Sequence, residues 1–374
     1  MSTATLHATC LCRLSHFSAP LPSSLPLLAS TCHCTSCRHN SGALYTSDVD
    51  WPDRTIDLSS LKTYPFSPTT NVHFCPRCGA GMFYSKPGSD EGEEGVWTGV
   101  WTGVLSVEGG DEKKGVELLK WKHAIYVKDT VDGGCSAWID GVGRFVERAV
   151  GENVQEIGDD WPDADASKKS GAEGKSEVGV WCKCRGVDFV LHREEWRGGD
   201  GEEEKEEDRE RRKLYLDPET GKFKASWCAC DSCRLSFGIE VVPWMFTDLK
   251  NLSMKDGTAL PSDMAGLRKG VDEGLPGLRS LAHYSSSPGV ERFFCSSCSA
   301  TVFYAHEDRP RVVDVAVGLL DAGEGARAES LLKWNFGRVG DKKDVEGSWR
   351  EEFVEGVERR MGEWAKKRDV RGQE

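Results

Sequence analysis

The chain has 374 residues, of which 38% are hydrophobic and 29% charged, and its formal net charge is −13. This composition is typical of a folded globular protein with polar insertions and excludes a fibrous chain. No run of about 18 apolar residues predicts a membrane span, and the acidic balance disfavours broad binding to a nucleic-acid backbone. Because no basic start and apolar segment form a signal peptide, we expect a cytoplasmic location.

Short runs rich in Val, Trp and Thr, punctuated by 41 Gly and 15 Pro, predict strands joined by turns. In chain order they lie at Gly95–Val107, Ala124–Val127, Val187–Leu191, Ala300–Tyr304 and Val312–Val317. We therefore expect a mainly β fold with small sheets and short helices. Bound metal would add to the stability of each modest core.

Cysteine is the unusual component, with 15 residues. All but Cys135 follow the pattern CxC…CxCxxC…CxxC, which occurs twice. In the reducing compartment that we expect, such cysteines more often hold a metal than form disulfides. We expect Cys135 to be a buried or a bystander thiol.

The repeated pattern predicts two domains of one type, at residues 1–149 and 178–355. Residues 150–177 are rich in Asp, Glu, Ser, Gly and Lys and are expected to form a flexible linker. Residues 356–374 are a charged tail, in which apolar residues near helical spacing predict a short amphipathic helix.

Polar insertions distinguish the two copies. The second gains an acidic run at Gly198–Lys213 and a Gly- and Ser-bearing stretch within Leu249–Ser287, whereas the first carries Gly88–Gly95. Because loops vary around a fixed frame, we expect these segments to be loops, and the acidic run to be solvated.

Zinc in a structural site takes four ligands in a tetrahedron. CPRCG at Cys75–Gly79 resembles a zinc knuckle, in which the glycine permits a tight turn. The free CxC pair completes such a site most simply. The expected closed sites are Cys10, Cys12, Cys75 and Cys78, and in the second copy Cys182, Cys184, Cys295 and Cys298.

Three cysteines remain in each copy: Cys32, Cys34 and Cys37 in the first, and Cys228, Cys230 and Cys233 in the second. Three thiolates can hold one zinc and leave its fourth position open, which is the property of a catalytic site. A substrate thiol could bind there as thiolate, because coordination lowers its pKa. Two alternatives remain open: a redox dithiol, or a fourth ligand such as His33, His39 or His123.

These motifs resemble the glutathione-dependent formaldehyde-activating enzyme family, which includes centromere protein V. The matching segments of the first copy are CLC at Cys10–Cys12, CHCTSCRHNSGA at Cys32–Ala43, FCPRCGAGMFY at Phe74–Tyr84 and LKWKH at Leu119–His123. Those of the second are CKCRGVDF at Cys182–Phe189, CACDSCRLSFG at Cys228–Gly238, RFFCSSCSATVFY at Arg292–Tyr304 and VGLLD at Val317–Asp321.

The resemblance implies two tandem β-tent domains with up to two zinc ions each. It implies a structural zinc at the outer CxC and CxxC pairs and a catalytic zinc at the central CxCxxC. The implied activity is that of a carbon–sulfur lyase, which reversibly adds the thiol of its partner glutathione to formaldehyde or another small aldehyde. Arg38 lies beside the first central cluster and is a candidate partner for a substrate carboxylate.

The two copies depart from the family pattern at different positions. The first keeps Gly79 and His123, whereas the second has Ser299 in place of the glycine. The second keeps Arg292, where the first has Val72. We expect the first copy to be the better candidate for activity. The rival hypothesis is a non-catalytic zinc-binding module that interacts with proteins, with its acidic inserts as spacers.

Overall fold

The computed structural model describes residues 4–87, 96–107, 117–145, 156–158, 161, 176–194 and 205–371. Strands dominate it, so the predicted mainly β class is confirmed. The expected small sheets and short helices are only partly found, because one sheet has eight strands, another has seven, and the helix at Glu351–Arg371 has 21 residues. Most of the predicted linker at 150–177, and the segment at Gly88–Gly95, lie outside this range. Among the helices in it, none is both long and apolar enough to cross a membrane.

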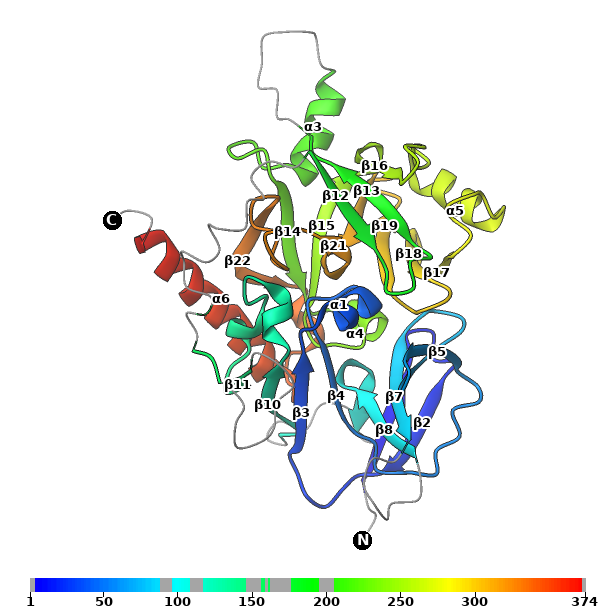
Figure 1. Cartoon of the computed structure of the whole chain (residues 1–374), viewed down its shortest axis with the longest axis vertical. Coiled ribbons are helices and arrows are strands. Elements are labelled where there is room, and N and C mark those ends of the chain that lie inside the picture. Colours follow the sequence, from blue (N-terminus) through cyan, green and yellow to red (C-terminus); the bar gives the residue numbers. More distant parts are fainter. Residues whose placement is uncertain are drawn as a thin grey trace.

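The first half, residues 4–145, contains two sheets joined by short helices (Figure 1). Its strands are β1 (Thr5–Thr9), β2 (His16–Pro20), β3 (Leu27–Cys32), β4 (Thr46–Asp50), β5 (Lys62–Ser67), β6 (Thr70–Phe74), β7 (Gly81–Pro87), β8 (Val96–Trp101), β9 (Leu105–Val107), β10 (Leu119–Ile125) and β11 (Gly143–Arg144). Its helices are α1 (Thr35–Ser41) and the 3-10 turns η1 (Thr102–Val104), η2 (Val127–Thr130) and η3 (Ser136–Trp138).

The second half, residues 176–371, also has two sheets. Its strands are β12 (Glu177–Trp181), β13 (Asp188–His192), β14 (Phe223–Cys228), β15 (Val242–Asp248), β16 (Leu252–Met254), β17 (Leu281–Ser287), β18 (Val290–Cys295), β19 (Thr301–His306), β20 (Val312–Ala316), β21 (Leu320–Asp321) and β22 (Leu332–Gly340). Its helices are α3 (Glu206–Tyr215), α4 (Asp231–Phe237), α5 (Met264–Asp272) and α6 (Glu351–Arg371), with 3-10 turns η4 (Leu249–Asn251), η5 (Val317–Leu319) and η6 (Lys342–Asp344).

The large sheets of the two halves have the same strand order, apart from β11, which extends the first sheet by one strand. In the first half the order is β11-β10-β3-β4-β8-β7-β6-β5, and in the second it is β22-β14-β15-β20-β19-β18-β17. Both contain a parallel pair at the same place, β10 with β3 and β22 with β14, and both pairs show a register shift. The first sheet has a second parallel pair, β10 with β11. The smaller sheets, β2-β1-β9 and β16-β13-β12-β21, accompany them.

The acidic run at Gly198–Lys213 was expected to be a solvated loop. This expectation was wrong for the residues from Glu206 onward. Its residues from Glu206 onward form α3. Arg211 Nε donates to the buried carboxylate of Asp248 at 2.8 Å, and Arg212 Nε donates to Glu194 at 2.9 Å. The two arginines anchor the helix because a buried acid, Asp248, and a half-buried acid, Glu194, face them. Likewise, Leu249–Ser287 contains β16, α5 and β17 rather than a loop alone.

The two halves contact each other through reciprocal glycine contacts near the centre of the molecule, where α1 and α4 lie (Figure 1). The amide of Gly103 donates to the carbonyl of Gly238 at 2.9 Å, and that of Gly318 donates to Gly42 at 2.8 Å. A Cβ on Gly103 would lie 2.2 Å from the Ile239 nitrogen. Side chains are therefore excluded at this close backbone approach.

Aromatic side chains also cross between the halves. Trp138, on η3 of the first half, is fully buried in the core of the second. Its ring lies edge-on to four rings of that half, with centroid distances of 5.5–6.4 Å: Trp227, Trp334, Phe336 and Trp364. In return, Phe353 of α6 packs on Trp121 of β10 at 4.4 Å. The two hydrophobic cores therefore share residues.

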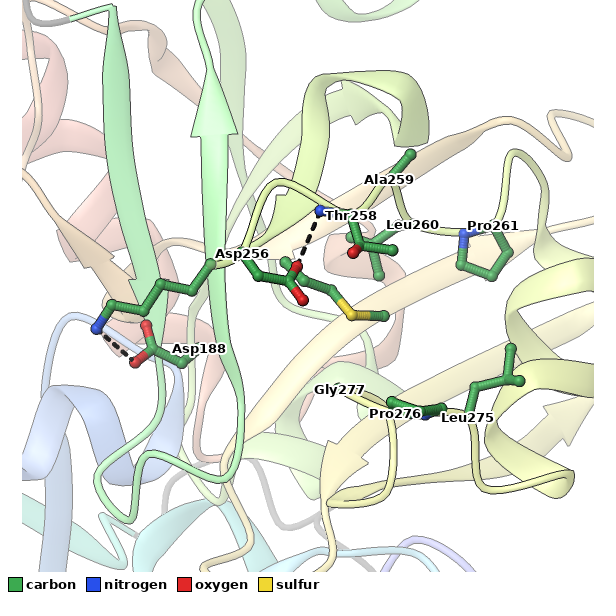
Figure 2. Close-up of a pocket in the computed structure, with 11 residues that line it drawn as sticks. Asp188, Asp256, Thr258, Ala259, Leu260, Pro261, Leu275, Pro276 and Gly277 are labelled. Atoms are coloured by element: carbon green, nitrogen blue, oxygen red, sulfur yellow. Dashed lines mark hydrogen bonds and ion pairs between the residues drawn. The ribbon is translucent and has the colours of Figure 1, made fainter.

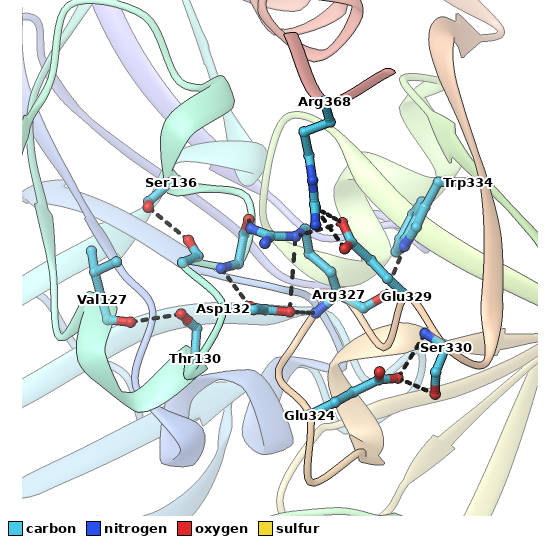
Figure 3. Close-up of polar contacts among 12 residues, drawn as sticks. Val127, Thr130, Asp132, Ser136, Glu324, Arg327, Glu329, Ser330, Trp334 and Arg368 are labelled. Carbon is cyan, nitrogen blue, oxygen red and sulfur yellow. Dashed lines mark hydrogen bonds and ion pairs between the residues drawn. The ribbon is translucent and has the colours of Figure 1, made fainter. Parts of the chain in front are cut away.

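A buried polar network joins the same segments (Figure 3). The carboxylate of Asp132 accepts from the backbone amides of Gly134 at 2.8 Å and Arg327 at 2.7 Å. The Arg327 guanidinium donates to the Gly134 carbonyl at 2.8 Å, and the Arg368 guanidinium donates to Glu329 at 2.6 Å. Burial raises the pKa of Asp132, whereas the Arg327 charge opposes that rise. These bonds satisfy a carboxylate that burial would otherwise penalise.

Candidate metal centres

Each predicted set of four cysteines is brought together in the structure. Within each set all four sulfurs lie within 4.8 Å of one another. The sulfurs of Cys10 and Cys12 are 3.5 Å apart, and those of Cys12 and Cys75 are 3.6 Å apart. A tetrahedral zinc with Zn–S bonds of about 2.3 Å requires sulfurs about 3.8 Å apart. The donor atoms therefore fit zinc, whose identity stays a prediction.

Both four-cysteine sets use the same knuckle turn. The amide of Gly79 donates to the Cys75 carbonyl at 3.0 Å, and that of Ser299 donates to Cys295 at 3.0 Å. Gly79 has φ +74° and Ser299 has φ +70°, so the serine adopts the left-handed conformation that favours glycine. The second half thus keeps the turn in spite of its serine. Gly79 has a further constraint, because a Cβ there would lie 2.3 Å from the Phe294 ring.

The two three-cysteine sets are built by the junction of a strand with a helix. Cys32 ends β3 and Cys34 caps α1, where its sulfur accepts from the Cys37 amide at 3.3 Å. Cys228 ends β14 and Cys230 caps α4, with the equivalent bond at 3.4 Å. A cap bonds the amide three residues later, so the CxxC spacing places both sulfurs at the helix N-terminus.

Among the described residues, neither three-cysteine set has a fourth donor that lies close to all three sulfurs. In the part of the chain that the structure describes, no other His, Cys, Asp or Glu donor lies within 4.8 Å of all three sulfurs. The His39 ring stacks on Trp181 with centroids 3.4 Å apart, and its Nδ1 lies 2.6 Å from the Trp181 carbonyl. Burial lowers the pKa of His33 and His39 to about 3 each. The His123 ring lies edge-on to Phe145.

The cysteine whose thiol pKa is lowered differs between the two sets. Contacts with the sulfurs of Cys32 and Cys37, aided by amides of α1, lower the pKa of Cys34 to about 3. In the second half, contacts with its two neighbouring sulfurs lower the pKa of Cys233, and the Arg292 charge adds to this effect. The local charge environment of the two sets is therefore not the same.

The second three-cysteine set opens into a cavity of about 450 Å³. Besides the cysteines, its wall includes two cations and two carboxylates: Arg292, Arg309, Asp314 and Asp341. Arg309 and Asp314 form two bonds, of 2.5 and 3.0 Å. Cys228 Sγ donates to Asp341 Oδ2 at 3.4 Å. Burial raises the pKa of Asp314 to about 6, although Arg309 opposes the rise.

Sequence reasoning missed Arg309, Asp314 and Asp341. Only Asp314 left a signal, because it interrupts the otherwise apolar and buried strand β20. Sequence reasoning also favoured the first half as the better candidate for activity, on the basis of Gly79 and His123. Gly79 lies in the four-cysteine knuckle, as predicted, and not at the three-cysteine set, and the His123 ring packs on a phenylalanine.

A larger cavity of about 700 Å³ lies elsewhere in the second half (Figure 2). Apolar and turn residues between Met254 and Gly277 form most of its wall, and Lys255 Nζ lies 3.4 Å from Asp188 at its edge. None of the predicted cysteine donors lines this cavity. We therefore place the candidate chemistry at the smaller cavity, where the sulfurs are.

Two further candidates have different outcomes. Arg38 is buried on α1, and its Nη2 donates to Thr35 Oγ1 at 3.3 Å and to the Asp129 carbonyl at 3.5 Å. Its Nη2 thus faces protein acceptors, whereas its Nε is buried without a hydrogen-bond partner among the described residues. The expected pairing with a substrate carboxylate stays a prediction. Cys135 is buried as predicted, and burial raises the pKa of its thiol to about 12.

One comparison with known proteins gives a match. A family model described as glutathione-dependent formaldehyde-activating enzyme matches residues 5–114. No curated protein and no solved structure matches the chain. The matched segment includes both cysteine sets of the first half. This part of the chain therefore carries a domain of a family associated with glutathione and formaldehyde.

Proposed function

We propose that the protein is a zinc-dependent carbon–sulfur lyase-like enzyme that reversibly adds the thiol of glutathione to formaldehyde or another small aldehyde. It is composed of two domains of one type, at 1–149 and 178–355, each with one closed and one open zinc centre. The single observation that carries the proposal is the pair of three-sulfur sets without a shared fourth donor among the described residues. The family match at residues 5–114 supports the choice of thiol and aldehyde.

Cys32, Cys34 and Cys37 would hold one open zinc, and Cys228, Cys230 and Cys233 the other. Bound zinc would supply a positive centre that accepts a thiolate and lowers the pKa of its thiol. The cysteines orient this position, because a capping bond fixes one sulfur of each set, that of Cys34 or Cys230, at the N-terminus of its helix. The cavity beside the second set, of about 450 Å³, gives the two reactants room to meet.

The reaction forms one bond between the thiol sulfur and the carbonyl carbon. The carbonyl π pair moves to oxygen, and the oxygen takes up the proton that the sulfur has lost. Asp341 lies at the edge of the cavity with its Oδ2 3.4 Å from Cys228 Sγ. Its carboxylate is therefore placed to hold the proton between sulfur and oxygen, and reversal of the same steps releases the aldehyde.

The alternative is a non-catalytic zinc-binding module that interacts with other proteins. One observation favours it: the helices that carry the three-cysteine sets also contact the other half, α1 at η5 and α4 at η1. In that case zinc at these sets would serve the contact between the halves.

Exchange NMR with formaldehyde and glutathione separates these two functions. We expect the wild-type chain to accelerate exchange between free and thiol-bound formaldehyde. A chain with both Cys34→Ser and Cys230→Ser should return to the spontaneous rate, because each open centre loses a zinc ligand. Circular dichroism confirms that the variant is folded. If the wild type gives no acceleration, the enzymatic proposal is wrong and the alternative is favoured.

A further inference from the structure

We propose that Arg292 is a positioning residue that adapts the second three-cysteine set, rather than the first, to accept an external thiolate as fourth metal ligand. The inference rests on the proposed function, because it assumes a metal at these cysteines. It reverses the preference for the first half that the sequence suggested.

Arg292 is held directly against the sulfurs. It lies on β18 with 4% of its surface exposed, and its Nη1 and Nη2 donate to Cys233 Sγ at 3.6 and 3.7 Å. Its Nε donates to Ser286 Oγ at 3.1 Å, and its guanidinium lies over the Tyr304 ring at 5.0 Å. All three nitrogens therefore have partners, and the charge is fixed in one place at the cavity wall.

The positive charge of Arg292 would favour a negatively charged fourth ligand at the metal. Three thiolates and a divalent cation carry a net charge of −1, and a fourth thiolate makes it −2. Buried charge is costly unless it is compensated. Arg309 cannot compensate it, because its charge is paired with Asp314. Arg292 supplies the missing positive charge, whereas a neutral fourth ligand would gain much less from it.

The first half lacks this cation at the matched position. Val72 pairs with Tyr84 across β6 and β7, in the same register in which Arg292 pairs with Tyr304 across β18 and β19. Val72 is fully buried and apolar. A carboxylate, Asp48, adds negative charge near Tyr84. A thiolate at the first set would therefore have less compensation.

Other nearby charges do not favour the second set. Asp341, whose Oδ2 accepts from Cys228 Sγ at 3.4 Å, adds negative charge there and would oppose a further thiolate. Arg38 of α1 and Arg234 of α4 are both buried at the same position relative to their cysteines. In the first half Lys86 opposes the effect of burial on Asp48. Arg292 is thus the distinguishing cation in contact with a sulfur of either set, among the residues the structure describes.

Cobalt-loaded full-length protein tests the inference without measuring turnover. The Cys34→Ser chain isolates the second open centre, and the Cys230→Ser chain isolates the first. Each is titrated with 2-mercaptoethanol, a thiol without a carboxylate, and binding is followed by sulfur-to-cobalt charge-transfer absorption. The thiol proton leaves to solvent as the thiolate binds. We expect the second centre to bind the thiol about 10-fold more tightly or more, as a bond to a charged group predicts.

Reciprocal exchange of the two matched residues gives the sharpest comparison. Arg292→Val should weaken thiol binding at the second centre by about 10-fold, and Arg292→Lys should restore part of it. Val72→Arg should strengthen thiol binding at the first centre, which keeps the test valid if Arg292→Val does not fold. Imidazole, a neutral ligand, should bind the variants and their parents with similar affinity.

The outcomes separate this inference from the proposed function. If cobalt binds at both three-cysteine sets but Arg292→Val leaves thiol affinity unchanged, the inference is overturned and the proposed function stands. If thiol and imidazole affinities fall together, Arg292 has only a structural role and the inference is again overturned. If neither three-cysteine set binds cobalt, the proposed function fails, and the inference fails with it.

Discussion

Cys295→Ser should unfold the second half, whereas Cys230→Ser in the same half should leave it folded. Cys295 is fully buried, and its sulfur lies 3.5 Å from that of Cys184 within the four-cysteine set. Structural zinc contributes about 10–16 kcal/mol to folding in small zinc domains, which matches or exceeds the 5–15 kcal/mol stability of a typical protein. Loss of one of its four ligands therefore removes most of the stability of that half.

Cys230 is the matched control because its set has three donors and lies beside a cavity. Its replacement removes one metal ligand and a sulfur cap of α4, which serine can replace at a cost of about 1 kcal/mol or less. Urea denaturation followed by circular dichroism gives the free energy of unfolding of both variants. Equal loss of folding in the two would contradict an open, exchangeable centre and indicate a structural role for both sets.

Trp138→Ala should destabilise the chain by about 3–5 kcal/mol, the usual cost of truncating a buried tryptophan in a core. The effect should appear in the unfolding of the second half, although Trp138 belongs to the first. Its ring contacts Trp227 and Trp364 with centroids 5.5 Å away in each case. Thermal unfolding by differential scanning calorimetry is the measurement.

Phe353→Ala provides the reciprocal control for this contact. Phe353 is only partly buried and packs on Trp121 at 4.4 Å. Its truncation should therefore cost less than that of Trp138. A change of less than about 1 kcal/mol for Trp138→Ala would show that the halves do not depend on this shared core.

The cysteine sets could be predicted from the sequence because their chemistry is local. Two residues separated by the CxxC spacing meet at one turn or one helix cap, whatever the rest of the fold does. Counting ligands then divides seven cysteines into four and three. The same spacing rule explains why Cys34 and Cys230 both cap helices in the structure.

Contacts between the halves could not be predicted from local patterns. Gly103 and Gly238 are separated by more than a hundred residues, and nothing in the sequence around either one indicates that their backbones meet at 2.9 Å. The helix within the acidic run could not be predicted from local patterns either. Its composition indicates solvation, but Arg211 and Arg212 face one buried and one half-buried acid, and these ion pairs dock the helix.

Arg292 shows what a comparison of the two sequence copies can and cannot reveal. The residue is visible as a difference from Val72, but its meaning depends on a sulfur 59 positions earlier in the chain. Only strand pairing places the guanidinium against Cys233 and opens the cavity beside it. The sequence therefore predicts which atoms could bind metal, whereas the folded structure determines the charge around them.

Metal analysis of the purified chain tests the central claim most directly. Two closed and two open centres predict close to four zinc ions per chain, because four separate cysteine sets are present. An added chelator should remove the ions of the three-cysteine sets first, since an outside ligand can reach them. Two zinc ions per chain, with the six cysteines of the three-cysteine sets free to react with an alkylating agent, would contradict the account.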